Sequence, residues 1–271
     1  MSLILCRQEP VKHPFYFEGL GVRLFSSQEL CYVIYNNPLL VMDQFVDENL
    51  IRFIREDLDM AFLASRLEKC LQSGEGADEL LVIILRECDY YTASEVSRFQ
   101  QNLVVYRRMS TAEFLKEKAD YLFSRKQYGK AVAEYRKILE LPKADRGGNA
   151  FLAKIYHNLG ASYARLFMTD KACQAYEQSF ELVKNGEVLK RICHLTLWNP
   201  RLLLNERFQA LMTDKLKQEC EREKETAEAL AAQADSLKEL EKLFQKDSIK
   251  RFQGAGQLIQ EWKQEYRKIM S

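Results

Sequence analysis

The sequence predicts an all-α protein, and three observations carry this prediction. The 271 residues include only 5 prolines and 11 glycines, which leaves few breaks for many short strands. Apolar residues recur at helical spacings of three and four along most of the chain. One segment with this pattern occurs twice in the middle of the sequence, which indicates a helical repeat. The hydrophobic content of 47% is sufficient for a buried core.

The N-terminal part, residues 1–110, is predicted to be a helical region of its own. Its first 25 residues contain two prolines and a Gly-Leu-Gly sequence, so we expect them to be irregular or extended. The first helix is expected to begin at Ser26, which forms an S-x-x-E capping box with Glu29. It should end before Pro38, because proline cannot continue a helix.

Four further helical segments follow in this region. Thr92 and Glu95 form a second capping box, and Ser73 to Gly76 is expected to be a loop. The segment around 60–71 forms a separate helix or continues the one before it. The expected helical segments are 50–63, 60–71, 78–87 and 96–106, of which the first two overlap.

The middle of the chain, residues 111–205, contains the repeat. A capping box at Ser110 and Glu113 precedes the first copy. In each copy a small residue would let two antiparallel helices approach closely, and an alanine and an aromatic residue on the second helix would fill the space between them. The copies are Ala112–Leu141 and Ala153–Leu182, with small residues Ala119 and Gly160, alanines Ala131 and Ala172, and aromatic residues Tyr135 and Tyr176.

At these positions the sequence resembles the tetratricopeptide repeat (TPR) family. The second copy departs from the family pattern, with Phe167 where glycine is usual and Thr169 where an aromatic residue is usual. A third copy is unclear, because His194 stands where a small residue is expected and Trp198-Asn199-Pro200 interrupts the segment. The resemblance implies a right-handed superhelix of helix pairs, in which the first helix of each pair lines a groove that binds a protein segment.

The resemblance also implies which side chains face that groove. Some members of the family hold the carboxylates of acidic protein tails with a lysine and asparagines. Lys116 and Asn158 stand at two of those places, but Asp120 stands where an asparagine is expected and would oppose an incoming carboxylate. The groove residues implied by the resemblance are Glu113, Lys116, Asp120, Phe123, Lys154, His157, Asn158, Ala161 and Arg165.

The C-terminal part, residues 206–271, is predicted to be a long charged helix with a short terminal helix. From Leu202 to Phe252 there is no proline or glycine, and apolar residues follow a weakly occupied heptad pattern. Such a helix of about 45 residues would extend about 70 Å. A break is expected at Gly254–Gly256. The helix either folds back as a hairpin at this break or pairs with a second chain.

Charge is distributed unevenly, although the formal net charge is only +1. Residues 1–110 carry a net charge of about −5, and residues 111–205 about +6. The balanced total argues against nucleic acid as a partner. Three interpretations of the positive middle region remain open. It favours an acidic ligand, it docks on the negative N-terminal region of the same chain, or it is only solvated surface.

We expect a cytoplasmic protein that contains no cofactor and no metal ion. No apolar stretch approaches the length of a membrane span or a signal peptide core, so no membrane contact is predicted. The cysteines are widely and irregularly spaced, which is typical of reduced thiols. The three histidines are scattered, and no catalytic motif is present. The cysteines are Cys6, Cys31, Cys70, Cys88, Cys173, Cys193 and Cys220, and the histidines His13, His157 and His194.

These observations favour a protein–protein interaction adaptor or scaffold that binds a protein or peptide in a TPR-like groove, with acidic segments among the candidate partners. The alternative is a structural, self-assembling protein that forms a homodimer through its C-terminal helix. An enzyme of unfamiliar type, with a site near Cys31, Tyr32 or His13, is the third hypothesis, and the sequence favours a protein that is not an enzyme.

Overall fold

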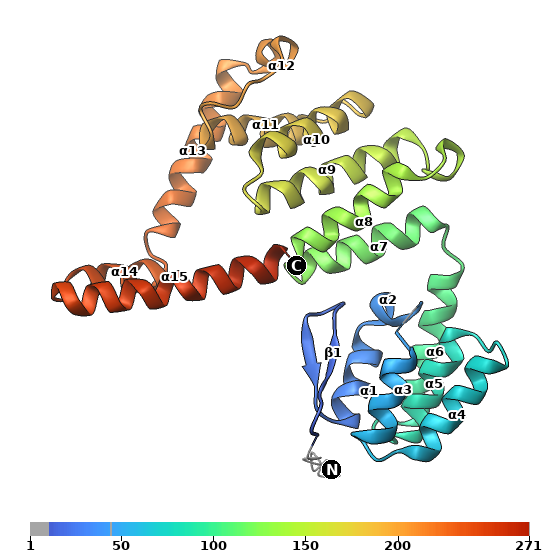
Figure 1. Cartoon of the computed structure of the whole chain (residues 1–271). Helices are drawn as coiled ribbons and strands as arrows, with labels where there is room; N and C mark the ends of the chain where they lie inside the picture. The colour runs from blue at the N-terminus through green and yellow to red at the C-terminus, as the bar shows by residue number, and fades with distance from the viewer. Residues whose placement is uncertain (1–10, 44, 271) are drawn as a thin grey trace. The chain divides into compact units, whose positions relative to one another are not determined.

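A computed structural model describes residues 11–43 and 45–270 (Figure 1). The prediction of an all-α protein is confirmed: helices α1–α15 make up most of this part of the chain, and its only sheet is one short hairpin. The chain divides into two units, of which the first ends at Ser110 and the second begins at Thr111.

The first unit begins with a β-hairpin in the segment that was expected to be extended. Strands β1 (Phe15–Phe17) and β2 (Val22–Leu24) pair antiparallel, with Phe17 opposite Val22. The turn between them uses Gly21 at a φ of +67°, a conformation that costs glycine little. Phe17 places its ring 4.8 Å from that of Phe45, so the hairpin packs on the helical core. Residues 1–10 of the expected extended segment lie outside the described residues.

Two helices of the first unit, α1 and α6, begin at the caps that the sequence marks. The Ser26 side chain accepts a hydrogen bond from the Glu29 amide, and Thr92 and Glu95 form a complete capping box. Asp59, at a φ of +54°, separates the second predicted helical segment from the third, so these are two helices. The helices are α1 (Ser27–Asn36), α2 (Pro38–Val41), α3 (Glu48–Glu56), α4 (Ala61–Gln72), α5 (Ala77–Glu87) and α6 (Ala93–Arg107).

The second unit places two contacting helix pairs in the segments where the two copies of the repeat were predicted. Helix α7 packs against α8 and α9 against α10, while α8 contacts α9 and α10 contacts α11 (Figure 1). The short 3₁₀ helix η1 lies in the longer loop between the pairs. The elements are α7 (Thr111–Ser124), α8 (Tyr128–Glu140), η1 (Lys143–Asp145), α9 (Asn149–Arg165), α10 (Thr169–Leu182) and α11 (Gly186–Trp198).

The small residues of the repeat lie at the helix contacts, as predicted. Ala119 is fully buried. A Cβ atom on Gly160 would lie 2.8 Å from the ring of Tyr176, which is closer than real Cβ contacts, so any other residue would force the ring or the helices to shift. The turns between the paired helices place Lys126 and Phe167 at positive φ, which is uncommon for residues other than glycine.

The prediction of one long C-terminal helix is wrong. The segment instead forms α12 (Glu206–Leu211), α13 (Asp214–Ala231), α14 (Asp235–Phe244) and α15 (Ser248–Met270). Helix starts are stabilised by capping side chains: Thr213 accepts from the Leu216 amide, and Asp247 accepts from the Lys250 amide at 2.9 Å. A heptad with few apolar residues gives too little packing energy to outweigh these local signals.

The predicted break at Gly254–Gly256 is also wrong, because these residues lie inside α15. The chain turns back before them, at residues 245–247, and α15 then packs against α14. A Cβ on Gly254 would collide with the side chain of Leu243. The glycine therefore allows close helix contact and does not end a helix.

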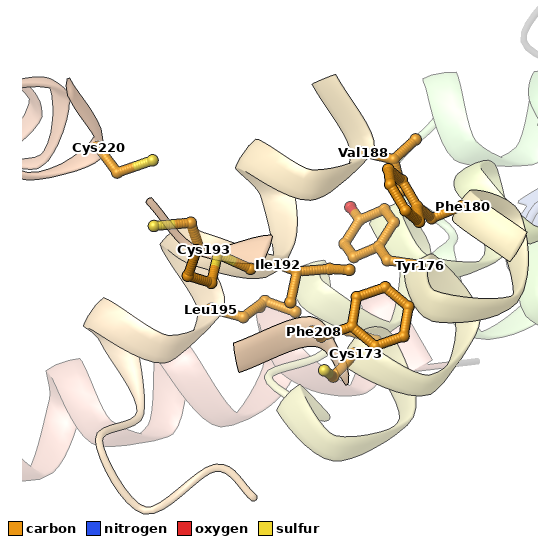
Figure 2. Packing of buried hydrophobic residues seen from close by; sticks show 11 residues of the cluster. Cys173, Tyr176, Phe180, Val188, Ile192, Cys193, Leu195, Phe208 and Cys220 are labelled. Carbon is orange, nitrogen blue, oxygen red and sulfur yellow. The ribbon is translucent and has the colours of Figure 1, made fainter. Parts of the chain in front are cut away.

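Helices α10, α11, α12 and α13 share one buried core (Figure 2). The Phe180 and Phe208 rings meet edge to face with centroids 5.7 Å apart. Cys220 of α13 is fully buried in this cluster. Helix α11 is thus followed by a second helix that packs on it, α13, after an interruption that contains α12.

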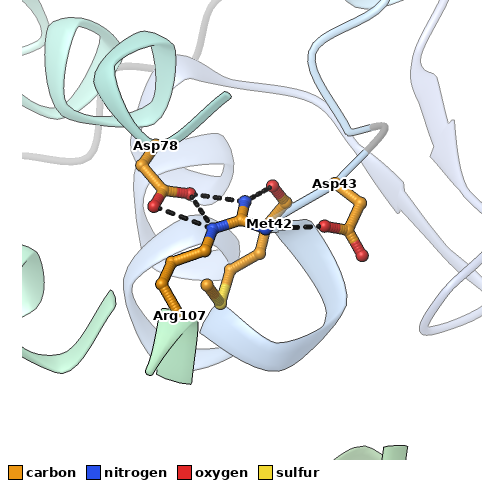
Figure 3. Close-up of polar contacts among 4 residues, drawn as sticks. All are labelled: Met42, Asp43, Asp78 and Arg107. Atoms are coloured by element: carbon orange, nitrogen blue, oxygen red, sulfur yellow. Dashed lines mark hydrogen bonds and ion pairs between the residues drawn. The ribbon is translucent and has the colours of Figure 1, made fainter. Parts of the chain in front are cut away.

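In the first unit, one arginine joins three segments (Figure 3). The Arg107 guanidinium donates to Asp78 at 2.8 and 3.0 Å, to Asp43 at 3.1 Å and to the main-chain oxygen of Met42 at 2.6 Å. Paired donors of this kind suit the planar fork of arginine. The contacts fix the end of α6 to the start of α5 and to the residues after α2.

Candidate functional site

A hollow of about 360 Å³ opens where α7, α9, α10 and α11 meet. Four of the side chains that the TPR resemblance assigned to a groove line it: Phe123, His157, Ala161 and Arg165. The hollow combines rings, small side chains and cationic groups, and no carboxylate lines it. The remaining lining residues are Ala164, Tyr176, Arg191, His194 and Leu195.

The positive charge of this hollow comes from two arginines on different helices. Arg165 ends α9 and Arg191 lies in α11, and both are exposed. Within residues 11–43 and 45–270, neither forms an ion pair. A guanidinium with no internal partner keeps its donors available for a carboxylate from outside.

The histidine beside these arginines is uncharged near neutral pH. Burial lowers the pKa of His157, and the positive charge of Arg191 lowers it further. The His157 ring lies 5.5 Å from the ring of Tyr176, so it forms part of the aromatic wall. Phe123 belongs to a similar pair, with its ring 5.0 Å from that of Tyr128. The hollow therefore offers flat apolar surfaces next to the two cations.

Three other predicted groove residues form an internal network outside this hollow. The Asp120 carboxylate accepts hydrogen bonds from Lys116 Nζ at 2.6 Å, from Asn158 Nδ2 at 3.0 Å and from the Tyr135 hydroxyl. Although burial lowers the pKa of Lys116, its bond to Asp120 outweighs that effect and the pKa is raised. The two groups that were candidates to grip a foreign carboxylate thus already hold one from the chain itself.

The last two predicted residues, Glu113 and Lys154, are exposed on α7 and α9 and line neither the hollow nor the network. Arg191 and His194 line the hollow but were not predicted. A signal for them existed, because they belong to the segment that could be read as a third repeat. The histidine at the small-residue position hid that relation.

The described cysteine thiols are free, and Cys6 lies outside the described residues. Cys31 is fully buried, and its contact with the Cys88 thiol and its burial both raise its pKa. A thiol with a raised pKa is a poor nucleophile, which argues against a reactive cysteine at this position.

The described residues contain no group of three or more histidine, cysteine or acidic side chains that could hold a metal ion. Within the same residues, no helix has both the length and the apolar content needed to cross a bilayer.

No family model, curated protein or solved structure matches the chain.

Proposed function

We propose that this chain is a protein-interaction adaptor of the TPR type that binds a partner segment with an acidic side chain. The pairs α7–α8 and α9–α10 would form the start of a right-handed superhelix, and the first helices α7, α9 and α11 would present its groove. The observation that carries the proposal is the hollow of about 360 Å³, in which two unpaired arginines stand beside aromatic side chains.

The position of the acidic contact differs from the one that the family resemblance implies. Lys116 and Asn158 are bonded to Asp120, and displacing that carboxylate would leave a partly buried charge without its partners. Arg165 and Arg191 need no such exchange. The acidic residue of the partner therefore binds these arginines, whose planar forks can each donate two hydrogen bonds to a carboxylate.

A random peptide library displayed on phage, selected on the full chain, tests the proposal. We expect selected peptides to be enriched in Asp and Glu, and their affinity to fall about tenfold or more for Arg165→Glu and for Arg191→Glu. Arg136→Glu makes the same charge change on the exposed side of α8 and is the matched control. Selected peptides that bind both groove variants as well as the unmodified chain would overturn the proposal.

A second candidate function, self-assembly, is favoured by the surface of α15. Several large apolar side chains of this helix are exposed, including Phe252 at 83% and Trp262 at 50%. Contiguous apolar surface of this kind marks interaction sites in water-exposed proteins. Under this candidate the chain forms a homodimer through the α14–α15 hairpin and not through a continuous coiled coil. The other exposed residues of this face are Ile249, Ile259 and Tyr266.

Cys31 of the first unit was a candidate for an enzymatic site. Its thiol is fully buried and has a raised pKa. His13 is exposed and its main-chain amide donates to Asp57 at 3.0 Å, which is a structural contact.

A further inference from the structure

A second and larger hollow, of about 610 Å³, lies between α11 and α13. Its wall from α11 is formed by His194, Leu197 and Trp198, and its wall from α13 is apolar at Ala227 and Ala231. The charged residues that also line it are Glu223, Lys224 and Glu228.

The sequence explains why these two helices do not close on each other as the earlier pairs do. Ala119 and Gly160 are small, and Gly160 lets the Tyr176 ring lie against the backbone of α9. His194 stands at the equivalent position of α11, and its imidazole occupies space between the helices. On the facing side of α13, Ala227 and Ala231 are too small to fill the space that His194 holds open between the two helices.

The charged side chains of this hollow are already matched within the protein. Glu223 forms an ion pair with Lys190 at 2.5 Å and lies 3.2 Å from His194 Nε2, which makes no hydrogen bond within the described residues. Lys224 lies 3.7 Å from Glu228. Because these charges have partners, what the hollow offers a ligand is mainly apolar surface.

The rim of the hollow is aromatic and exposed. Trp198 is 70% exposed, and its ring centroid lies 6.0 Å from that of Phe167, which is 66% exposed. Tryptophan beside a cavity with small apolar walls is a common anchor point at protein interfaces. Phe167 occupies a turn position that is usual for glycine in the TPR family and holds a positive φ of 58°. Phe167 and Trp198 thus place two large, exposed rings side by side at the edge of this hollow.

His194 lines both hollows, so the two adjoin along α11. One end is cationic through Arg165 and Arg191, and the other is apolar and internally neutralised. A partner segment that covers both hollows must therefore be acidic at one point and apolar at another.

We infer that the partner segment is recognised by an acidic residue together with a bulky apolar residue a few positions away. The acidic side chain binds Arg165 and Arg191, and the apolar side chain enters the hollow between α11 and α13 against Trp198. This inference rests on the proposed function and adds the second half of the recognition element.

Peptides from the selection described above, bound to the full chain and followed by fluorescence anisotropy, test the inference. Ala227→Leu fills the hollow and Trp198→Ala removes its rim, and we expect each to weaken binding about tenfold. Ala229→Leu makes the same change on the exposed side of α13 and should have no effect. Two hollow variants are used so that a folding defect in one, detected by circular dichroism, leaves the other informative.

The peptide provides the matching control. Replacing its bulky apolar residue by serine should cost as much affinity as Ala227→Leu, and the two changes together should cost little more than either alone. Peptides that lose affinity with Arg165→Glu but not with Ala227→Leu or Trp198→Ala would overturn this inference and leave the proposed function standing. Peptides that respond to none of these changes would overturn both.

Discussion

The hydroxyl of Tyr135 donates a hydrogen bond to the carboxylate of Asp120, and this contact joins α8 to α7 inside the first helix pair. Tyr135 is the aromatic residue of the repeat pattern and is 1% exposed. Asp120 also bonds Asn158 of α9, so one carboxylate links three helices. Burial and the neighbouring carboxylate both raise the pKa of the Tyr135 phenol, which keeps its proton on the donor.

Asp120→Ala should destabilise the second unit by about 2–3 kcal/mol, because it leaves the Tyr135 hydroxyl buried without an acceptor and Lys116 without its ion pair. Asp120→Asn keeps an acceptor oxygen and should cost less. Both tryptophans, Trp198 and Trp262, lie in the second unit, so tryptophan fluorescence during urea denaturation follows that unit alone. Equal stability of the alanine variant and the unmodified chain would contradict the network.

Gly160→Ala should cost about 1–3 kcal/mol, because the new methyl group would lie 2.8 Å from the Tyr176 ring and the helices would have to separate. Gly186→Ala is the control, since a Cβ at Gly186 meets no atom within 4 Å. Thermal denaturation of the two variants measures the difference. A Gly160→Ala protein as stable as the Gly186→Ala protein would mean that α9 and α10 are not in close contact there.

The second unit should lose stability as the pH falls below about 6.5. Burial lowers the pKa of both His157 and His194 below the ordinary histidine value of about 6.5, and the charge of Glu223 only partly opposes this effect at His194. Below pH 6.5, a histidine whose pKa is lowered stays neutral in the folded chain and takes up a proton when the chain unfolds. A lower pH therefore favours the unfolded state. The contribution of the two histidines is fully present above pH 6.5 and is lost below it.

Urea denaturation between pH 8 and pH 5 measures this dependence through the tryptophan fluorescence. The double variant His157→Gln, His194→Gln should show a flatter profile over this range. His13→Gln is the control, because His13 lies in the first unit. A profile as steep for the double variant as for the unmodified chain would assign the pH dependence to other groups.

The self-assembly candidate predicts a dimer that dissociates on dilution in sedimentation experiments. Phe252→Glu with Trp262→Glu would place two charges on the exposed apolar face of α15 and should give a monomer at all concentrations. Gln260→Glu, an exposed change on the same helix, is the control and should leave the dimer intact. Sedimentation of the unmodified chain as a monomer up to high concentration would remove this candidate.

Local signals made the helices predictable from the sequence. The Thr92–Glu95 capping box, the spacing of apolar residues and the small residues Ala119 and Gly160 act over a few positions along the chain, and the structure places each as expected. The local signal at Gly254 predicts a helix break, but this glycine instead allows α15 to approach Leu243. The sequence does not distinguish a glycine that ends a helix from a glycine that permits close packing. The position of the neighbouring helix decides between the two.

The groove could be predicted only in part, for a different reason. Phe123, His157, Ala161 and Arg165 followed from a repeating pattern, because helical periodicity puts such residues on one face. Arg191 joins Arg165 at one hollow only because α11 packs against α10, and Asp120 captures Asn158 only because of the register between α7 and α9. Contacts between helices depend on shape and distance across the core, and a pattern read along a single chain carries neither.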